Sequence, residues 1–198
     1  SSKTSFKDYI ANGSFSTISD SNIATEDEQK KAEERKKEEA KTQKEEEERK
    51  LKEKYEKKFE VHEVDGADQI GKDIATDLMG ITDKDEWDTA VDNINKIDKE
   101  NVYSVIKAYA AEEGWGTDNI LEQIATEDGR EKEQQKKLIN HIIKAVLDYC
   151  EQYGSNSQSA YKELEKYKNG ITDEVFNSPE DKLRAVDRLI LRVFGIRN

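Results

Sequence analysis

The chain has 198 residues and a formal net charge of −12, with 39% charged and 33% apolar residues. Its one cysteine, Cys150, excludes an internal disulfide framework and a cysteine-based metal cluster, and two histidines exclude a histidine-rich site. No run of residues approaches the roughly 18 apolar positions that a membrane-spanning helix needs. The length of the chain predicts one domain, or one domain with an extension.

The negative charge is distributed unevenly along the chain. Residues 26–60 hold 13 basic and 14 acidic residues, whereas residues 61–198 hold 18 basic and 29 acidic ones. The excess acidity therefore lies on the only part that is long enough to bury a core. Because phosphate backbones require clustered Lys and Arg, we expect no nucleic-acid partner.

Residues 1–25 form an N-terminal arm that is rich in Ser, Thr and Asn. Its apolar side chains are isolated and follow no sustained period, so the arm cannot fold alone. Two interpretations fit this pattern. The arm is either a flexible tail or a docking segment whose aromatic side chains contact a partner, and the second assigns that contact to Phe6, Tyr9 and Phe15.

Residues 26–60 are predicted to form one long charged helix, which we call the strut. Good helix formers dominate this segment, and acid-to-base pairs recur at a spacing of four residues, for example Glu45–Arg49 and Glu46–Lys50. A coiled coil needs apolar side chains at two positions of every heptad. The stretch from residue 26 to residue 50 offers only Ala32 and Ala40, so we expect a single solvated helix that acts as a spacer.

Three apolar residues near the end of the strut share one helix face. They are Leu51, Tyr55 and Phe59, spaced four residues apart. We expect the helix to contact the rest of the protein along this stripe.

Residues 61–198 read as an acidic all-α head. Apolar residues recur at a helical period, and no alternating pattern typical of strands appears. The expected fold class is therefore all-α. The first five helices are expected over residues 67–79, 84–97, 100–112, 118–127 and 131–153.

Connectors of this head repeat one pattern in which glycine is followed by Thr-Asp. The three copies are Gly80-Ile81-Thr82-Asp83, Gly114-Trp115-Gly116-Thr117-Asp118 and Gly170-Ile171-Thr172-Asp173. Glycine readily adopts the left-handed conformation that ends a helix, and Thr or Asp caps the next one. A role as turns between helices is sufficient to explain why these residues occur here.

The helix order and the first connector resemble an annexin repeat, a five-helix unit with a Gly-x-Gly-Thr-Asp loop between its first two helices. The resemblance covers residues 67–153, and the Gly170 connector suggests part of a second unit. The first connector lacks the second glycine of the family's loop.

This resemblance implies a calcium site. Calcium prefers six to eight oxygen ligands. In annexins the loop carbonyls join a carboxylate from the end of the fourth helix. The matching residues here are Gly80, Ile81 and Thr82 through their carbonyls, with Glu127 as the carboxylate.

The Ser-Phe-Lys-Asp-Tyr-Ile segment at residues 5–10 precedes the charged strut and the annexin-like unit. Together these parts resemble virion proteins of tailed phages that infect gut Bacteroidales. The resemblance implies a place in a virion.

No motif for nucleotide binding, hydrolysis or metalloprotease chemistry occurs. His141 and Cys150 lie nine positions apart on one predicted helix, too far to touch. Cys150 is expected to be a small buried side chain, and His141 is expected at the edge of the core. Trp115 stands between two glycines, so it either folds back onto the core or contacts a partner. We therefore expect no enzyme.

Two functions remain open. The first is a non-enzymatic structural protein whose partners are other subunits of a larger assembly. The second is a calcium-dependent, annexin-like module that binds a membrane or another surface.

Overall fold

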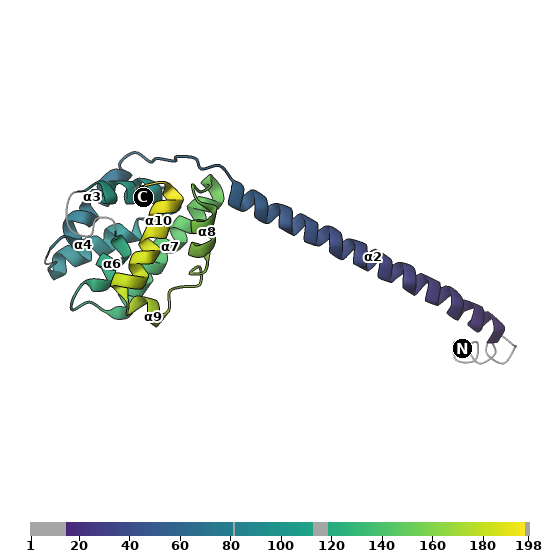
Figure 1. Cartoon of the computed structure of the whole chain (residues 1–198). Coiled ribbons are helices and arrows are strands. Elements are labelled where there is room, and N and C mark those ends of the chain that lie inside the picture. The colour runs from purple at the N-terminus through teal and green to yellow at the C-terminus, as the bar shows by residue number, and fades with distance from the viewer. Residues whose placement is uncertain (1–14, 81, 113–118, 197–198) are drawn as a thin grey trace, which may run out of the picture. The chain divides into compact units, whose positions relative to one another are not determined.

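The computed structural model describes residues 15–80, 82–112 and 119–196, and for residues 15–24 it describes the backbone alone. All regular structure in these ranges is helical (Figure 1), which confirms the all-α fold class. No helix in the described ranges is long and apolar enough to cross a bilayer.

The helices follow the expected order along the chain. The five helices expected between residues 67 and 153 correspond to α3 to α7, with ends that differ by a few residues. The elements are α2 Phe15–Glu56, α3 Ala67–Leu78, α4 Lys84–Asn95, α5 Val102–Ala111, α6 Ile120–Thr126, α7 Lys132–Tyr153, α8 Gln158–Glu165, α9 Asp173–Phe176, the π-helical turn η1 Pro179–Leu183 and α10 Arg184–Phe194.

The chain divides into two compact units, Ser1–Leu51 and Lys52–Asn198. Helix α2 begins at Phe15, earlier than the expected residue 26, and it ends at Glu56. No glycine or proline interrupts residues 15–64. Because extending an existing helix costs far less than nucleating one, the helix continues into the Ser- and Thr-rich segment.

The second unit includes the last turn of α2, because this turn packs against its core. The ring of Tyr55 meets Tyr161 of α8 edge-on, with centroids 5.3 Å apart. Lys54 Nζ lies 2.7 Å from Glu165 Oε2. Leu51, the first residue of the predicted apolar stripe, is 50% exposed. Of the predicted stripe, only Tyr55 contacts the core from the helix, because Phe59 packs against the core from the extended segment after Glu56.

Residues 57–66, which we call the strap, connect α2 to α3 in an extended conformation. The backbone N–H of Glu60 donates to the carbonyl of Tyr153 at 2.7 Å. The Tyr149 hydroxyl donates to the Glu60 carbonyl at 2.7 Å and accepts from the N–H of His62 at 2.8 Å. These bonds satisfy the strap's backbone groups without a helix.

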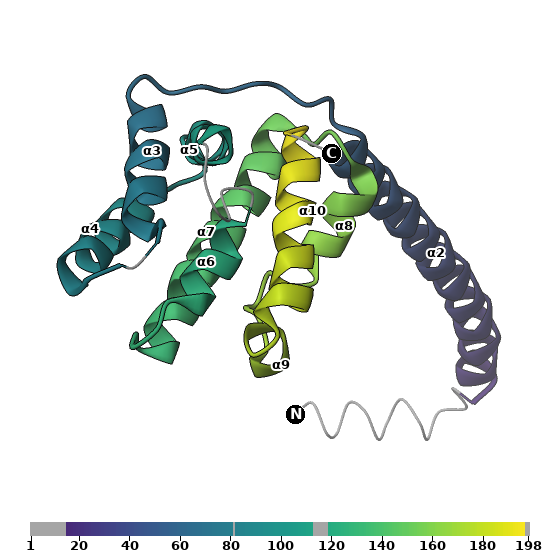
Figure 2. The same ribbon diagram turned by 60° about the vertical axis from the view of Figure 1, so that its left-hand side comes forward.

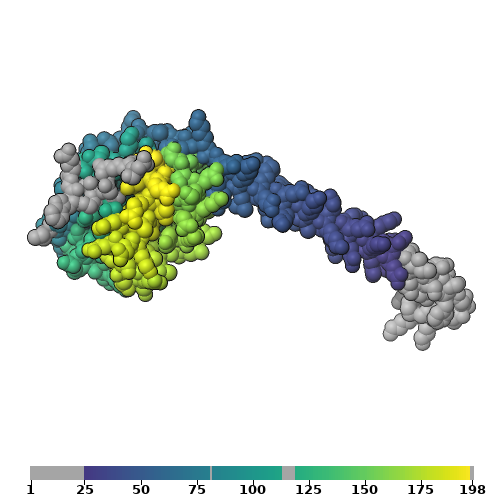
Figure 3. Space-filling model, viewed as in Figure 1, coloured from purple at the N-terminus to yellow at the C-terminus, as the bar shows by residue number. Residues whose placement is uncertain are grey.

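The core of the second unit lies between two groups of helices. Helix α3 packs against α4 and α5 on one side, and α10 packs against α6, α7 and α8 on the other. Figure 2 shows α6, α7 and α10 side by side. In Figure 3, the residues of α8, α9 and α10 form one continuous face of this unit.

Aromatic side chains fill the space beneath the strap. Phe59 lies 5.5 Å from Tyr103 and 6.0 Å from Tyr149, measured between ring centroids.

Cys150 is fully buried, and burial raises the pKa of its thiol to about 12. The ring Nε2 of His141 lies 2.6 Å from the Ile97 carbonyl. Cys150 is therefore buried as predicted, and His141 is partly buried, as expected for the edge of the core.

Candidate functional site

The connector between α3 and α4 positions the first of the predicted ligands. Gly80 has a φ of 72°, in the left-handed region that ends a helix. Asp83 then caps α4: its carboxylate accepts from the N–H of Glu86 at 2.8 Å, and the Glu86 carboxylate accepts from the N–H of Asp83 at 3.4 Å. This reciprocal pair is a capping box, which confirms the predicted role of Asp83 as a cap.

Thr82 meets Glu127 in space, as the annexin resemblance implies. Its hydroxyl lies 3.2 Å from Oε1 of Glu127, 45 positions away in the chain. The same hydroxyl donates to the carbonyl of Asp77 at 2.7 Å. Thr82 is 8% exposed, so both contacts lie beneath the surface. Gly80 lies beside them in the chain, and Ile81 falls outside the described residues.

A cation that the sequence reasoning missed completes this arrangement. Nη2 of Arg130 donates to the backbone carbonyl of Thr82 at 2.8 Å. The guanidinium also lies over the indole ring of Trp87, 5.6 Å from its centroid. The signal in the sequence was a lone basic residue directly after Glu127-Asp128-Gly129. We call this set the Arg130 corner; it comprises Asp77, Thr82, Trp87, Glu127 and Arg130.

Two glutamines of helix α7 make hydrogen bonds to the corner and to the end of α6. The side chain of Gln135, which is 4% exposed, donates to the carbonyls of Ile124 at 2.8 Å and Glu127 at 3.1 Å. These carbonyls end α6, where a helix has unpaired acceptors. Gln134 accepts from the indole N–H of Trp87 at 3.0 Å. The corner thus joins the α3–α4 connector to the α6–α7 turn.

Burial dominates the electrostatics of the corner. It raises the pKa of Glu127, while the hydrogen bond to Thr82 and the charge of Arg130 act in the opposite direction. It also raises the pKa of Asp77, which the nearby Asp73 and Glu86 increase further. Oδ2 of Asp77 and Nε of Arg130 are buried without a hydrogen-bond partner among the described residues.

No group of three or more His, Cys, Asp or Glu side chains in the described ranges is arranged to hold a metal ion. Calcium coordination by Gly80, Ile81, Thr82 and Glu127 stays a prediction. The structure brings Thr82 and Glu127 together, and it adds a positive side chain to the same place.

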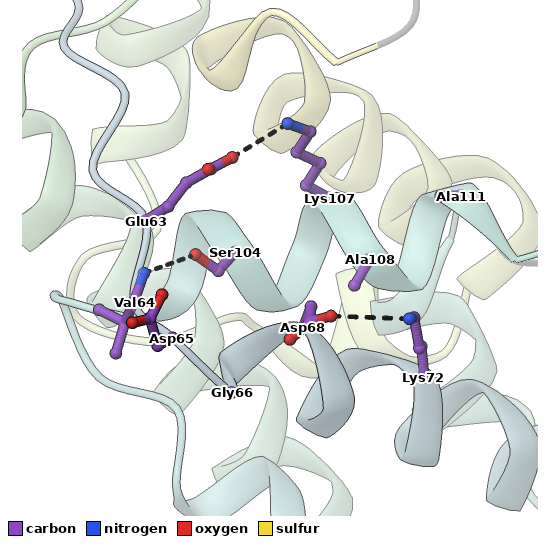
Figure 4. A pocket seen from close by; sticks show the side chains of 10 residues that line it. All are labelled: Glu63, Val64, Asp65, Gly66, Asp68, Lys72, Ser104, Lys107, Ala108 and Ala111. Carbon is purple, nitrogen blue, oxygen red and sulfur yellow. Dashed lines mark hydrogen bonds and ion pairs between the residues drawn. The ribbon is translucent and has the colours of Figure 1, made fainter.

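A pocket of about 430 Å³ lies between the strap, α3 and α5 (Figure 4). Two ion pairs lie along its walls, Glu63–Lys107 at 3.0 Å and Asp68–Lys72 at 3.6 Å. The N–H of Val64 donates to the hydroxyl of Ser104 at 3.2 Å, which fixes the strap at one edge. The four charged groups of these two pairs are exposed. Its lining residues are Glu63, Val64, Asp65, Gly66, Asp68, Lys72, Ser104, Lys107, Ala108 and Ala111.

The predicted partner contacts lie at the edges of what the structure describes. Phe6, Tyr9 and Trp115 fall outside the described residues, and Phe15 is the first residue of α2 with its backbone alone described. Their role in binding a partner stays a prediction.

Comparisons with protein-family models, with curated proteins and with solved structures give no match for this chain.

Proposed function

We propose that this chain is a non-enzymatic structural protein and a subunit of a larger assembly, such as a phage virion. In this role the N-terminal arm docks on another subunit, and the charged helix spaces the helical head from that contact. The partners are therefore other proteins.

The exposure of α2 is the observation that carries this proposal. From Thr25 to Lys50 every side chain is exposed except Ala32, which is partly buried. A helix that is polar on all sides has no apolar face to bury against another element. Its length of 42 residues corresponds to about 60 Å. These properties suit a spacer rather than a folding element.

Local charge pairing supports the helix without tertiary contacts. Glu46 lies 3.7 Å from Lys50 and 3.8 Å from Arg49, measured between charged atoms. Such exposed pairs contribute only about 0.3–0.5 kcal/mol each. They recur along the helix in sequence, so their sum favours a helix that stands in solvent.

Spin-label distances test the spacer. With nitroxides on Glu28→Cys and Glu48→Cys, a helix gives a narrow distribution near 30 Å from its rise per residue. Cys150 stays unlabelled, because its thiol is buried with a pKa of about 12. A broad distribution would contradict the proposal. A chain labelled only at Glu28→Cys is the control: a coiled coil adds an intermolecular distance, and a single helix gives none.

Native purification from the source tests the assembly. The full chain is expected to co-sediment with a particle much larger than 22.8 kDa, and a chain without residues 1–25 is expected to sediment alone. Trp115→Ala separates the two roles of that residue. Retained thermal stability with lost incorporation indicates a contact, whereas a large loss of stability indicates the core. A full-length chain that sediments as a monomer in its native extract would overturn the proposal.

A further inference from the structure

Three residues of the Arg130 corner, Asp77, Thr82 and Trp87, belong to an acidic stretch of the head. Residues 65–95 contain nine acidic and two basic residues. The carboxylates of Asp77 and Glu127 both lie within electrostatic reach of Glu86. These three side chains are partly buried, and a nearby cation lowers the cost of holding such carboxylates together. A positive side chain is therefore favoured where the α3–α4 connector meets the α6–α7 turn.

We infer that the guanidinium of Arg130 takes the place of a bound metal ion at this corner, so that the corner closes without calcium. Nη2 of Arg130 bonds at 2.8 Å to the Thr82 carbonyl, one of the oxygens that the annexin resemblance assigns to calcium. A divalent ion bound to that oxygen would lie beside the guanidinium, and like charges repel. The residues present therefore do not fit the metal that the resemblance implies.

The contacts of Arg130 show that it is held in place. Its guanidinium lies 5.6 Å from the centroid of Trp87, within the range of a cation–π contact. The indole N–H of Trp87 is itself fixed by Gln134 at 3.0 Å. Arg130 would lose both the hydrogen bond to Thr82 and the contact with Trp87 if its side chain moved away.

Thr82 is also bound through its side chain. Its hydroxyl donates to the Asp77 carbonyl at 2.7 Å and lies 3.2 Å from Oε1 of Glu127. Calcium needs at least six oxygens. The described residues provide no cluster of three side-chain ligands anywhere. In place of a metal ion, the guanidinium of Arg130, whose donors lie in one rigid plane, bonds to the connector.

Thermal unfolding of the full chain in millimolar calcium and in a chelator tests this inference. The native chain is expected to keep the same midpoint within about 1 °C and to give no saturable heat in a calcium titration. Arg130→Met keeps the length and apolar contact of the side chain but removes its charge. We expect it to lower the midpoint by about 5 °C, and Arg130→Lys by less. Arg188→Met, at an exposed position of α10, is the matched control and is expected to change little.

Two outcomes would overturn the inference. One is a rise of the native chain's midpoint in calcium, or a calcium-binding heat that Glu127→Gln abolishes. The other is an Arg130→Met variant as stable as the native chain. If Arg130→Met does not fold, the calcium titration of the native chain and the Arg130→Lys variant still decide the matter.

Discussion

At the scale of single residues, Asp187 shows how one buried carboxylate joins two distant helices. It lies on α10 and is 1% exposed. It accepts hydrogen bonds from the N–H groups of Leu121 at 2.9 Å and Glu122 at 3.1 Å. Helix α6 has no side-chain cap from its own N-cap residue, Asn119. Asp187 therefore supplies from α10 the acceptor that the first turn of α6 needs.

The titration of Asp187 gives a pH-dependent prediction. Burial raises its pKa well above the ordinary value, although the two N–H donors and Arg184 oppose this and Glu122 adds to it. The folded chain thus holds this proton more tightly than the unfolded chain does. Its contribution to stability is present below about pH 4 and is lost as the pH rises through the folded pKa.

Urea unfolding between about pH 4 and pH 7 measures this effect against Asp187→Asn, which cannot titrate. The free energy of unfolding of the native chain, minus that of the variant, is expected to fall as the pH rises. Asp92→Asn, at an exposed position on α4, is the control and should give a flat difference. A difference for Asp187→Asn that is flat or rises with pH would show that the carboxylate is not destabilised by burial.

At the scale of elements, the approach of α3 to α5 depends on a glycine. A Cβ on Gly71 would lie 2.2 Å from the carbonyl oxygen of Val105 and 3.0 Å from Cβ of Ala108. The first distance is far below a van der Waals contact, and the obstacle is backbone that cannot rotate away. The two helices can pack this closely only because residue 71 has no side chain.

Gly71→Ala is expected to destabilise the protein even though alanine is the better helix former. The gain in helix propensity is about 1 kcal/mol, whereas forcing two packed helices apart costs about 1–3 kcal/mol or more. We expect a net loss of about 1–2 kcal/mol, measured by urea unfolding. Thr76→Ala, at an exposed position of the same helix, should change stability by no more than about 0.5 kcal/mol. An unchanged or raised stability of Gly71→Ala would mean that α3 and α5 lie farther apart than described.

At the scale of the whole molecule, the second unit contains the entire described core. Residues from Tyr55 and Phe59 near its start to Ile196 near its C-terminal end in sequence pack into one core cluster. Gly154 also belongs to this arrangement, since a Cβ there would lie 2.4 Å from the carbonyl oxygen of Lys58 in the strap. The last turn of α2 and the strap are therefore structural parts of the helical body.

Two truncated chains test this division. A chain of residues 52–198 is expected to unfold cooperatively with a midpoint within about 3 °C of the full chain. A chain of residues 67–198 lacks Tyr55 and Phe59 and uncovers the aromatic cluster, so its midpoint should fall by about 10 °C or more. Circular dichroism during heating measures both. Equal midpoints for the two truncated chains would show that the strap does not stabilise the core.

Much of the fold was predictable because the pattern of residues within each helix is enough to indicate that helix. Apolar residues at a 3.6-residue period located α3 to α7, and Gly80 with Asp83 marked the connector between α3 and α4. The strut was recognisable because its residues favour a helix and lack an apolar face. Its true end at Glu56 was not, because Lys57 and Phe59 read as helix until the strap's contacts with α7 are known.

The candidate site depends on contacts between residues far apart in the chain, and no local sequence pattern predicts such contacts. The annexin resemblance brought Thr82 and Glu127 together, but nothing in the sequence placed Arg130 on the Thr82 carbonyl or Asp187 at the start of α6. By itself, the sequence determined the all-α class, the order of the helices and the concentration of acidity after residue 60. The tertiary structure alone decided which cation compensates that acidity at the α3–α4 connector and which carboxylate is buried. The physical reason is that periodicity fixes only which face of each helix is apolar, whereas charge compensation and burial depend on which faces meet in space.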